Sequence, residues 1–427
     1  ISCIGPAGEN LVRYAAIMTN YHDAAGRTGM GAVMGSKKLK AIGVSGSRKV
    51  ELANPEEFME TARKAIEEVR ESFYTDLMKS IGTSAYVELG QELGDMPNKY
   101  FTKGIFENAS KISGSEIAEK YVVKSKACFG CPIACGKIVK LKVDGEEIEV
   151  DGPEYETVCA FGSLMLNDDL EGLLKANYLC NEYGLDTISC SSTIAFTMLL
   201  FEKKKIGEKE LGFKLEWGDI EAVNKLIEDI ALKRGAGTLL AEGVKRIGEK
   251  FKAEELAAHV KGLEIPFHDP RAFYGMAVCY ATSPRGACHL QGDMYMVDMG
   301  FEIKELEIEP GDRFSEKGRA KTIVKIQNWR TIYNSLIMCQ FCNPQAKLIP
   351  ELLTYATGWK YTLKSLDEIG EKIFNLKRKL NIKLGVTKKD DKLPKIVLTA
   401  LNEGGAKGKT PNLEVMLKEY YKERGWL

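Results

Sequence analysis

Apolar residues near the start of the chain come in short continuous runs, whereas later ones recur at helical spacing. Within residues 1–50, the runs "LVRYAAIM" and "LKAIGV" predict two strands joined by the glycine-rich connection "AAGRTGMGAVMGSKK". Asn54, Pro55 and Glu57 then have the pattern of an N-cap, a first-turn proline and a capping-box acid, which predicts a helix to about Glu71. The chain therefore begins with part of a sheet and continues as helices.

One hairpin interrupts the helical pattern. Apolar and polar residues alternate over 139–143 and over 148–150, and Asp144-Gly145 between them predicts a turn. Helical periodicity returns over 168–183 and stops at Gly184, and Asp186 is placed to cap the next helix. That helix carries the longest apolar run, "TIAFTMLLF", which is too short to span a membrane.

These patterns predict an α+β fold that is mostly helical. We expect the carboxyl-terminal part of a sheet-rich domain at residues 1–50, followed by two mainly helical domains at residues 51–257 and 258–427.

The composition gives no support for binding to nucleic acid or to a membrane surface. Lys plus Arg and Asp plus Glu number 60 each, so net charge points to neither nucleic acid nor a membrane surface. Eleven scattered cysteines with one tight cluster fit a reducing compartment better than a disulfide framework, which predicts a cytoplasmic protein. The chain has no initiator Met, so its original start is expected to be missing and the lack of a signal peptide carries little weight.

The cluster "CFGCPIAC" places Cys128, Cys131 and Cys135 on a loop with the spacing Cys-x2-Cys-x3-Cys. A second pair, Cys339 and Cys342, would complete a zinc site, which favours two Cys-x2-Cys pairs. The extra cysteine at x3 favours an iron–sulfur cluster instead, with its fourth ligand from Cys339 or Cys342. We expect Cys159, Cys180 and Cys190, which lie among apolar residues on helices, to be inert.

Candidate acid–base residues are few, because the chain has four histidines. His22, in a loop, and His259, on a predicted helix, are expected to be structural. His268 and His289 lie in an irregular stretch where loops more often carry function, and His289 is the stronger candidate because small residues and Arg285 surround it.

Two glutamates enter an apolar element after a Gly-Pro turn in "VDGPEYETV". Glu154 or Glu156 could act as an acid or base with a raised pKa, or could simply cap the following helix. The residues alone do not choose between these roles.

Together these motifs resemble the aldehyde ferredoxin oxidoreductase family of tungsten-pterin enzymes. The resemblance covers almost the whole chain and rests on seven segments in family order: "IGPAGEN", "GAVMGSKKLKAI", "CFGCPIACG", "GPEYET", "GLDTIS", "YATSPRGACH" and "MLKEYYKERGW". It implies a sheet-rich domain that supports the cofactor and two helical domains that enclose it. It also implies that the chain begins midway through the first domain and stops slightly before the family's usual end.

The resemblance implies a ligand set for a 4Fe-4S cluster. The family's fourth cysteine ends a six-residue motif that "NSLIMC" matches, so the ligands would be Cys128, Cys131, Cys135 and Cys339. Cys342 would then be a bystander.

The resemblance also implies contacts to a bis-pterin cofactor. Asn181 and Asp186 lie in "NEYGLD" and Asn334 begins "NSLIMC"; the family often has Asp where Asn181 and Asn334 stand, and an amide can still hydrogen-bond a pterin edge. The region of Arg27, Gly29 and Gly31 would meet the pterin phosphates, where glycines and a helix start allow close approach of an anion. Asn10 would lie near a Mg²⁺ ion that bridges the two phosphates.

Some members of the family hold an iron ion at a dimer interface through Glu-x2-His. Here the matching stretch is "KANY", from Lys175 to Tyr178, so we expect no interfacial iron, and a homodimer remains possible without it.

The activity implied is oxidation of an aldehyde to a carboxylic acid, with ferredoxin as electron acceptor and tungsten or molybdenum on the pterins. Glu156 would be the general base, and His289 would hydrogen-bond the aldehyde oxygen or an oxo group on the metal. One alternative is the tungsten-pterin subunit of a class II benzoyl-CoA reductase type complex. Another is an iron–sulfur electron carrier or a structural zinc protein, which would leave the pterin motifs unexplained.

Overall fold

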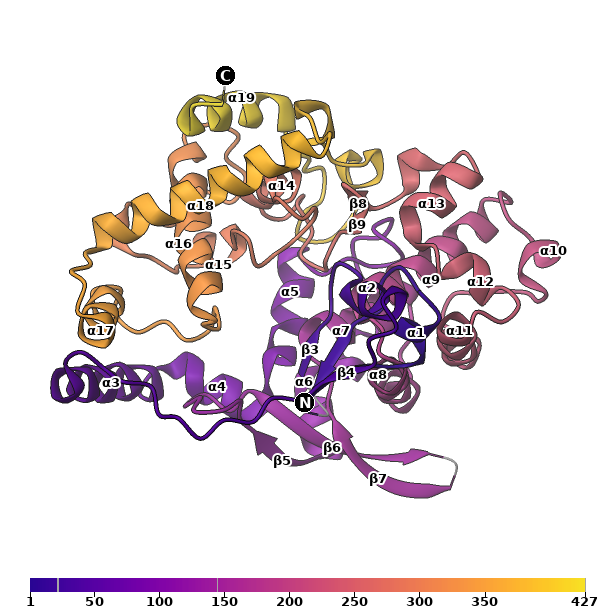
Figure 1. Cartoon of the computed structure of the whole chain (residues 1–427). Helices are drawn as coiled ribbons and strands as arrows, with labels where there is room; N and C mark the ends of the chain where they lie inside the picture. The colour runs from indigo at the N-terminus through magenta and orange to yellow at the C-terminus, as the bar shows by residue number, and fades with distance from the viewer. Residues whose placement is uncertain (21–22, 144, 427) are drawn as a thin grey trace.

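The computed structural model describes residues 1–20, 23–143 and 145–426 and contains three small sheets among many helices (Figure 1). The mostly helical α+β class is therefore confirmed. None of the described helices combines the length and the apolar character that crossing a bilayer requires.

The amino-terminal segment forms a four-stranded antiparallel sheet of order β3-β2-β1-β4. Two short helices pack beside it, and Figure 1 shows the whole unit in indigo at the centre of the molecule. The predicted strands are real but much shorter than the apolar runs, and the glycine-rich connection itself contains a strand and a helix. The elements are β1 (Ser2–Ile4), α1 (Pro6–Glu9), β2 (Ile17–Thr19), β3 (Asp23–Ala25), α2 (Met30–Ser36) and β4 (Ala41–Ile42).

The predicted helix after Asn54 is present, although the Asn54 side chain makes no capping hydrogen bond. The Asn54 amide instead donates to the carbonyl of Tyr355, 2.8 Å away, which ties this segment to the late part of the chain. The helices of this region are α3 (Pro55–Arg70), α4 (Phe73–Ile81), η1 (Thr83–Tyr86), α5 (Val87–Leu93), η2 (Ala109–Ile112) and α6 (Gly114–Lys120).

The predicted hairpin is confirmed within a three-stranded antiparallel sheet of order β5-β6-β7 that extends from the bottom of the molecule (Figure 1). Gly145 has a φ of +91°, which suits a glycine in the turn, whereas Asp144 lies outside the described residues. The strands are β5 (Val122–Lys126), β6 (Gly136–Val143) and β7 (Glu146–Asp151).

The two helices expected around Gly184 form as their boundary residues predict. Gly184 ends the first in a left-handed conformation, and the Asp186 carboxylate accepts from the amides of Ile188 and Ser189 at the start of the second. The elements here are α7 (Tyr155–Phe161), η3 (Ser163–Met165), α8 (Leu170–Tyr183), α9 (Thr187–Glu202), α10 (Glu208–Leu211), α11 (Ile220–Leu232), α12 (Gly237–Leu240) and α13 (Gly243–Lys250).

His259 corrects a prediction, because it lies on a strand rather than a helix. Lys261 and Gly262 have φ values of +54° and +87°, so the chain turns back there and His259 pairs with Glu264 across a two-stranded ribbon. His22 lies outside the described residues. The elements are η4 (Glu254–Leu256), β8 (His259–Val260) and β9 (Leu263–Glu264).

The remaining chain is helical and forms the orange and yellow group in Figure 1. The long α16 packs against α18 and α19, and α17 returns to pack on α3. The elements are α14 (Tyr274–Thr282), α15 (Met294–Asp298), η5 (Lys304–Leu306), α16 (Ala320–Leu336), α17 (Leu348–Thr357), α18 (Leu363–Lys383), η6 (Lys388–Asp390), η7 (Lys395–Leu398) and α19 (Leu413–Arg424).

One continuous hydrophobic core joins all three expected domains. It includes Ala7 from the first, Leu199 from the second and Trp329 from the third. The boundaries at residues 50 and 257 therefore stay predictions, and the site described next lies where the helical parts meet.

Candidate functional site

The cysteine cluster lies on the loop between β5 and β6. Lys126 and Gly136 pair across these strands, so the loop is closed immediately before Cys128 and after Cys135. Inside it, the Cys131 amide donates to the Cys128 carbonyl at 3.0 Å. The spacing of the motif thus produces a compact loop that directs several sulfurs toward one region.

A buried lysine fixes the end of this loop. The Lys137 ammonium donates to the carbonyls of Cys135 and Met78, both at 3.0 Å, and also to those of Ala134 and Gly136. Burial lowers the pKa of Lys137, while the neighbouring Cys135 and Glu154 oppose that shift. Lys137 was not identified as a functional residue from the sequence.

Both cysteines of the distant pair lie close to the loop. Cys131, Cys135 and Cys342 all pack against a small apolar group, Val69, Met78 and Ile133. Burial raises the pKa of Cys135 to about 12, with Glu154 and Cys339 as further causes. Burial also raises the pKa of Cys342 to about 11, with Cys131 and Cys339 adding to it. The choice of Cys339 as the fourth ligand stays a prediction.

Within the described residues, no three His, Cys, Asp or Glu side chains are arranged to hold a single metal ion. The ligand sulfurs of an iron–sulfur cluster stand on a larger framework than those around one ion. The iron–sulfur cluster expected at these cysteines stays a prediction.

Two neighbouring cavities lie among the cysteines and the acid–base residues. A cavity of about 450 Å³ is lined by Glu156, His289, Asn334 and Cys339, among others. A second, of about 300 Å³, has the cluster cysteines Cys128 and Cys135 and the motif residues Asn181 and Asp186 in its wall. The same three side chains, Glu154, Thr157 and Thr187, line both cavities. Residues far apart in sequence thus surround one region.

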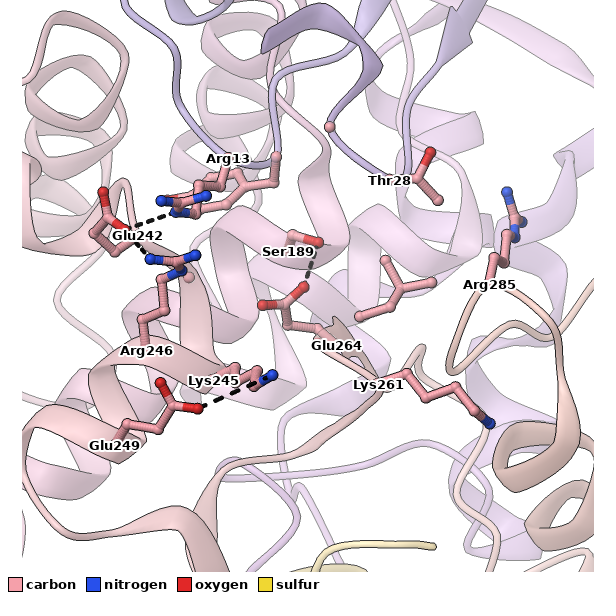
Figure 2. Close-up of a pocket in the computed structure, with 15 residues that line it drawn as sticks. Arg13, Thr28, Ser189, Glu242, Lys245, Arg246, Glu249, Lys261, Glu264 and Arg285 are labelled. Atoms are coloured by element: carbon pink, nitrogen blue, oxygen red, sulfur yellow. Dashed lines mark hydrogen bonds and ion pairs between the residues drawn. The ribbon is translucent and has the colours of Figure 1, made fainter. Parts of the chain in front are cut away.

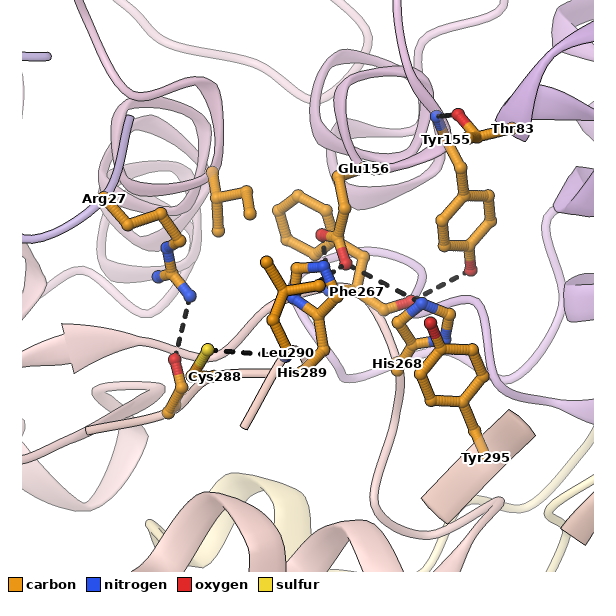
Figure 3. A network of polar contacts seen from close by, with 12 residues as sticks. Arg27, Thr83, Tyr155, Glu156, Phe267, His268, Cys288, His289, Leu290 and Tyr295 are labelled. Atoms are coloured by element: carbon orange, nitrogen blue, oxygen red, sulfur yellow. Dashed lines mark hydrogen bonds and ion pairs between the residues drawn. The ribbon is translucent and has the colours of Figure 1, made fainter. Parts of the chain in front are cut away.

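Glu156 reaches this region from the first turn of α7 (Figure 3). Its Oε2 accepts from the Phe267 amide at 2.8 Å, whereas its buried Oε1 has no hydrogen-bond partner. Oε1 lies 3.6 Å from His289 Nδ1 and 3.8 Å from His268 Nε2. Burial raises the pKa of Glu156, which His268 and the Phe267 amide counteract. The carboxylate is thus positioned by one oxygen and available through the other.

His289 faces the same carboxylate oxygen. Its side chain is 12% exposed, and its buried Nδ1 has no hydrogen-bond partner. Burial lowers the pKa of His289 well below its usual range, and His268, Arg27 and Arg285 lower it further. His289 is therefore a neutral imidazole with hydrogen-bonding capacity left for a bound molecule.

A second histidine, which sequence reasoning ranked lower, belongs to the same network. His268 Nδ1 lies 2.5 Å from Asp95 Oδ2, and the Tyr86 hydroxyl donates to the same Oδ2 at 3.1 Å. Tyr295 stacks on the imidazole with ring centroids 3.8 Å apart. Burial lowers the pKa of His268, but the Asp95 carboxylate outweighs burial and the net direction is upward.

Asp95 and Tyr295 were not identified from the sequence. Asp95 precedes His268 by 173 positions, and neither residue belongs to a motif that marks the pairing. The acidic "GD" at residues 94–95 gives no local signal, because its partner is supplied only by the tertiary fold.

Asp186 is bound from several directions as well as capping α9. Ser189 Oγ lies 2.6 Å from its carboxylate and 2.7 Å from that of Glu264 (Figure 2 shows the second contact), while Arg27 Nε lies 3.5 Å from it. Arg27 also donates to the Ala287 carbonyl at 2.8 Å (Figure 3). Arg27 thus joins the amino-terminal segment to the helical part of the chain.

Gly29 and Gly31 have a structural explanation. A Cβ atom at either position would overlap the carbonyl oxygen of Arg13 or Ala16, at about 2.0 and 2.3 Å, and Gly29 begins α2 with a φ of +70°. The Gly31 amide donates to Ala15. Their contact with pterin phosphates stays a prediction.

Asn10 donates to the carbonyl of Ala231 at 2.9 Å, which joins α1 to the end of α11. Its role near Mg²⁺ also stays a prediction.

The two motif asparagines occupy equivalent places at helix ends. Asn181 lies in the last turn of α8 and Asn334 in the last turn of α16. Each helix ends three residues later with a left-handed residue, Gly184 in one and Ile337 in the other. The similar backbone turns bring each asparagine to the wall of one of the two cavities.

A larger chamber of about 650 Å³ adjoins the cavity that Glu156 and His289 line. Five side chains line both: Thr83, Tyr155, His268, Tyr295 and Phe341. The rest of its wall is mainly apolar, and Glu302 is the one carboxylate among the described residues that line it.

A further cavity of about 440 Å³ lies between the amino-terminal segment and α13 (Figure 2). Its arginines Arg13 and Arg246 both pair with Glu242, at 2.7 and 3.5 Å, so their charges are partly neutralised. We assign it no function.

The residues present fit a pterin-bound metal. The adjoining cavities provide room, the asparagine amides can match polar pterin edges, and Glu156 Oε1 and His289 Nδ1 are buried without a hydrogen-bond partner.

Known proteins with related sequences support this assignment. The family model described as the amino-terminal domain of aldehyde ferredoxin oxidoreductase matches residues 1–46, and the model for domains 2 and 3 matches residues 60–427. The tungsten-containing aldehyde ferredoxin oxidoreductase of Pyrococcus furiosus is 41% identical over 434 residues, covering 100% of this chain and 70% of that protein. The enzyme of the same name from Thermococcus kodakarensis is 39% identical with the same coverage.

More distant relatives share the fold. The WOR-like subunit of an aliphatic sulfonate oxidoreductase from Pyrococcus furiosus is 31% identical, covering 99% of this chain and 67% of that one. A solved complex, the active site complex BamBC of benzoyl coenzyme A reductase with 1,5 dienoyl-CoA, contains a similar chain with a TM-score of 0.77 and 21% identity. That similarity covers 100% of this chain and 71% of the other.

The fold, the site and these matches define an oxidoreductase of the tungsten-pterin class. The chain belongs to the aldehyde ferredoxin oxidoreductase family.

Proposed function

We propose that this protein oxidises an aldehyde to a carboxylic acid and passes the electrons to ferredoxin. The observation that carries the proposal is the buried Glu156, whose free oxygen faces His289 in a cavity that Cys339 and Asn334 also line. Relatives that are 39% to 41% identical over the full chain carry the name of this activity.

Residues of this chain would hold three groups. Cys128, Cys131, Cys135 and Cys339 would bind a 4Fe-4S cluster, and Asn181, Asp186 and Asn334 would contact the pterins. Arg27, Gly29 and Gly31 would approach the pterin phosphates, and Asn10 would lie near their Mg²⁺. The pterin-bound tungsten, when present, supplies a two-electron acceptor.

The chemistry left to the protein is proton transfer and orientation. Oxidation of an aldehyde requires an oxygen atom from water, so a base must remove a proton as that oxygen attacks the carbonyl carbon. Glu156 Oε1 is the base, because it is buried, unpartnered and held in place through Oε2. Neutral His289 donates a hydrogen bond to the aldehyde oxygen.

We further infer a reducing compartment, the cytoplasm, and ferredoxin as the redox partner. All eleven cysteines are free of disulfides, and all eleven lie within the described residues. A homodimer, if formed, would lack an interfacial iron, since Lys175 and Tyr178 stand at the expected ligand positions.

The test is the substitution Glu156→Gln, which keeps the shape and removes the base. We expect kcat for aldehyde oxidation to fall by about 10²- to 10⁴-fold while tungsten and iron contents are unchanged. Glu154→Gln is the matched control: Glu154 lies two residues earlier, at the start of α7, but it is exposed and its carboxylate accepts from Thr83, so the loss of activity should be much smaller. Near-normal turnover of Glu156→Gln with full metal loading would contradict the proposal.

A further inference from the structure

We propose that Asp95 and His268 are positioning residues: Asp95 holds His268 as an imidazolium, and this cation keeps the buried Glu156 ionised so that it can act as the base. The inference rests on the function proposed above. Burial favours the protonated form of Glu156, whereas a base must be ionised to accept a proton. A nearby cation is needed to reverse that preference.

The geometry supplies that cation. His268 Nε2 is 3.8 Å from Glu156 Oε1, and His268 Nδ1 is 2.5 Å from Asp95 Oδ2 on the other side of the ring. An imidazolium carries an N–H on both nitrogens: Nδ1 bonds to Asp95, and Nε2, at 3.8 Å, acts on Glu156 Oε1 through its charge rather than through a hydrogen bond. Stacking on Tyr295 at 3.8 Å and the Tyr86 hydroxyl bond to Asp95 fix the arrangement.

Other acids near His268 are already neutralised. Asp293 forms a two-bond pair with Arg330, both contacts at 2.8 Å, and Asp269 is bound by Arg271. No arginine or lysine bonds to the Asp95 carboxylate among the described residues, so Asp95 is the available counter-ion for His268.

Other groups around Glu156 do not replace this pair. His289 is neutral, as its pKa is lowered by burial and by neighbouring cations. Arg27 favours the ionised form of Glu156, but its guanidinium also serves Asp186 and two carbonyls. The remaining neighbours are weak acids whose pKa values are raised by burial and which therefore stay neutral: Tyr155, Cys159, Tyr280 and Tyr295.

Glu156 takes up and releases one proton in each turnover. Glu156 Oε1 takes one proton from the attacking water as the new C–O bond forms. The two electrons of the aldehyde C–H bond pass through the redox groups to two one-electron ferredoxins, and the hydrogen of that bond leaves as a proton to solvent. The other proton of the water stays on the acid product and leaves when the product ionises. Before the next turnover Glu156 releases that proton to solvent. The Asp95–His268 pair favours this release because the imidazolium makes the protonated form of Glu156 less favourable.

The experiment is the pH profile of kcat/KM for Asp95→Asn. Without the Asp95 charge, the pKa of His268 falls, the imidazole becomes neutral and the pKa of Glu156 rises. We expect the acid limb of the profile to move to higher pH by about 1 to 3 units, with activity recovered at alkaline pH. His268→Gln should move it in the same direction.

Asp298→Asn is the matched control, because it removes a buried aspartate that pairs with Arg319 and does not face Glu156. Its acid limb should stay at the wild-type position. If the acid limb of Asp95→Asn also stays at the wild-type position, the proposed role of Asp95 and His268 is overturned. If the wild-type protein oxidised no aldehyde, the proposed function itself would fail.

A second measurement does not depend on the folding of Asp95→Asn or His268→Gln. Infrared difference spectra of the wild-type holoenzyme, with the Glu156 band assigned by its loss in Glu156→Gln, report the protonation state directly. We expect a carboxylate at pH 7. A protonated Glu156 at that pH would overturn the proposal even if Asp95→Asn and His268→Gln did not fold.

Discussion

Single residues of the same type have different surroundings in this protein, and the cysteines show it best. Cys339 lines the cavity of about 450 Å³ together with Glu156, whereas Cys342 packs on the apolar group of Val69, Met78 and Ile133. The Cys339 sulfur also accepts weakly from the Phe341 amide, which orients it. Only one of the two faces the region that the motif residues surround.

We therefore expect Cys339→Ser to destroy or strongly alter the electron paramagnetic resonance signal of the reduced cluster. Cys342→Ser should leave that signal intact, because it replaces a packing contact rather than a ligand. Iron content per chain, measured alongside, should fall in the first variant alone. The reverse pattern would make Cys342 the fourth ligand.

At the scale of elements, the sheet of β5, β6 and β7 holds the cysteine loop in place. β5 and β6 close its two ends, and Lys137 binds four carbonyls there while lying in the interior. A fixed positive charge beside Cys135 favours the reduced, more negative state of a cluster.

Lys137→Met should lower the reduction potential of the cluster. We expect a shift on the order of a tenfold change in the equilibrium, about 59 mV for a one-electron couple, measured by a redox titration of the resonance signal. Lys124→Met, which removes an exposed lysine paired with Glu149 on the same sheet, should have little effect because solvent screens it. Equal shifts in both variants would argue against a specific role for Lys137.

Elements with local chemical signals could be predicted from the sequence, and those set by the tertiary fold could not. Gly184 and Asp186 identify a helix end and a helix start through their own backbone and side-chain bonds. Around His259 the alanines suggest a helix, but the left-handed Lys261 and Gly262 turn the chain back into a ribbon. The tight turn outweighs the weak helical preference.

In the candidate site too, residues with a local sequence signal could be predicted, and residues brought together by the tertiary fold could not. Glu156 and His289 lie within motifs and were proposed from them, and the structure brings them to 3.6 Å. The pairing of Asp95 with His268 could not be found, because it joins segments 173 residues apart and leaves no periodic or spacing signal in either.

At the scale of the whole molecule, the helical parts enclose two adjoining spaces that share a wall. The cavity of about 450 Å³ is lined by Glu156 and His289, and the adjoining chamber of about 650 Å³ is lined largely by aromatic rings, methionines and leucines. The Tyr86 and Tyr155 hydroxyls bond to Asp95 and to the Phe267 carbonyl, so these rings add apolar surface to the chamber. An aldehyde held at Glu156 would extend its substituent into that space.

This arrangement predicts how the preference for substrate size can be changed without touching the acid–base residues. Leu89 lies on α5 in the chamber wall and is 46% exposed, so a lysine there can be accommodated while placing charge beside a bound apolar group. Leu89→Lys should lower kcat/KM for 3-phenylpropanal by about ten- to a hundredfold and leave acetaldehyde nearly unchanged, since the shorter substrate does not reach the chamber. Leu376→Lys, at an exposed position on α18, is the control and should alter neither value. An equal loss for both aldehydes in Leu89→Lys would indicate a general disturbance of the fold, and no loss for either would mean that the substituent lies elsewhere.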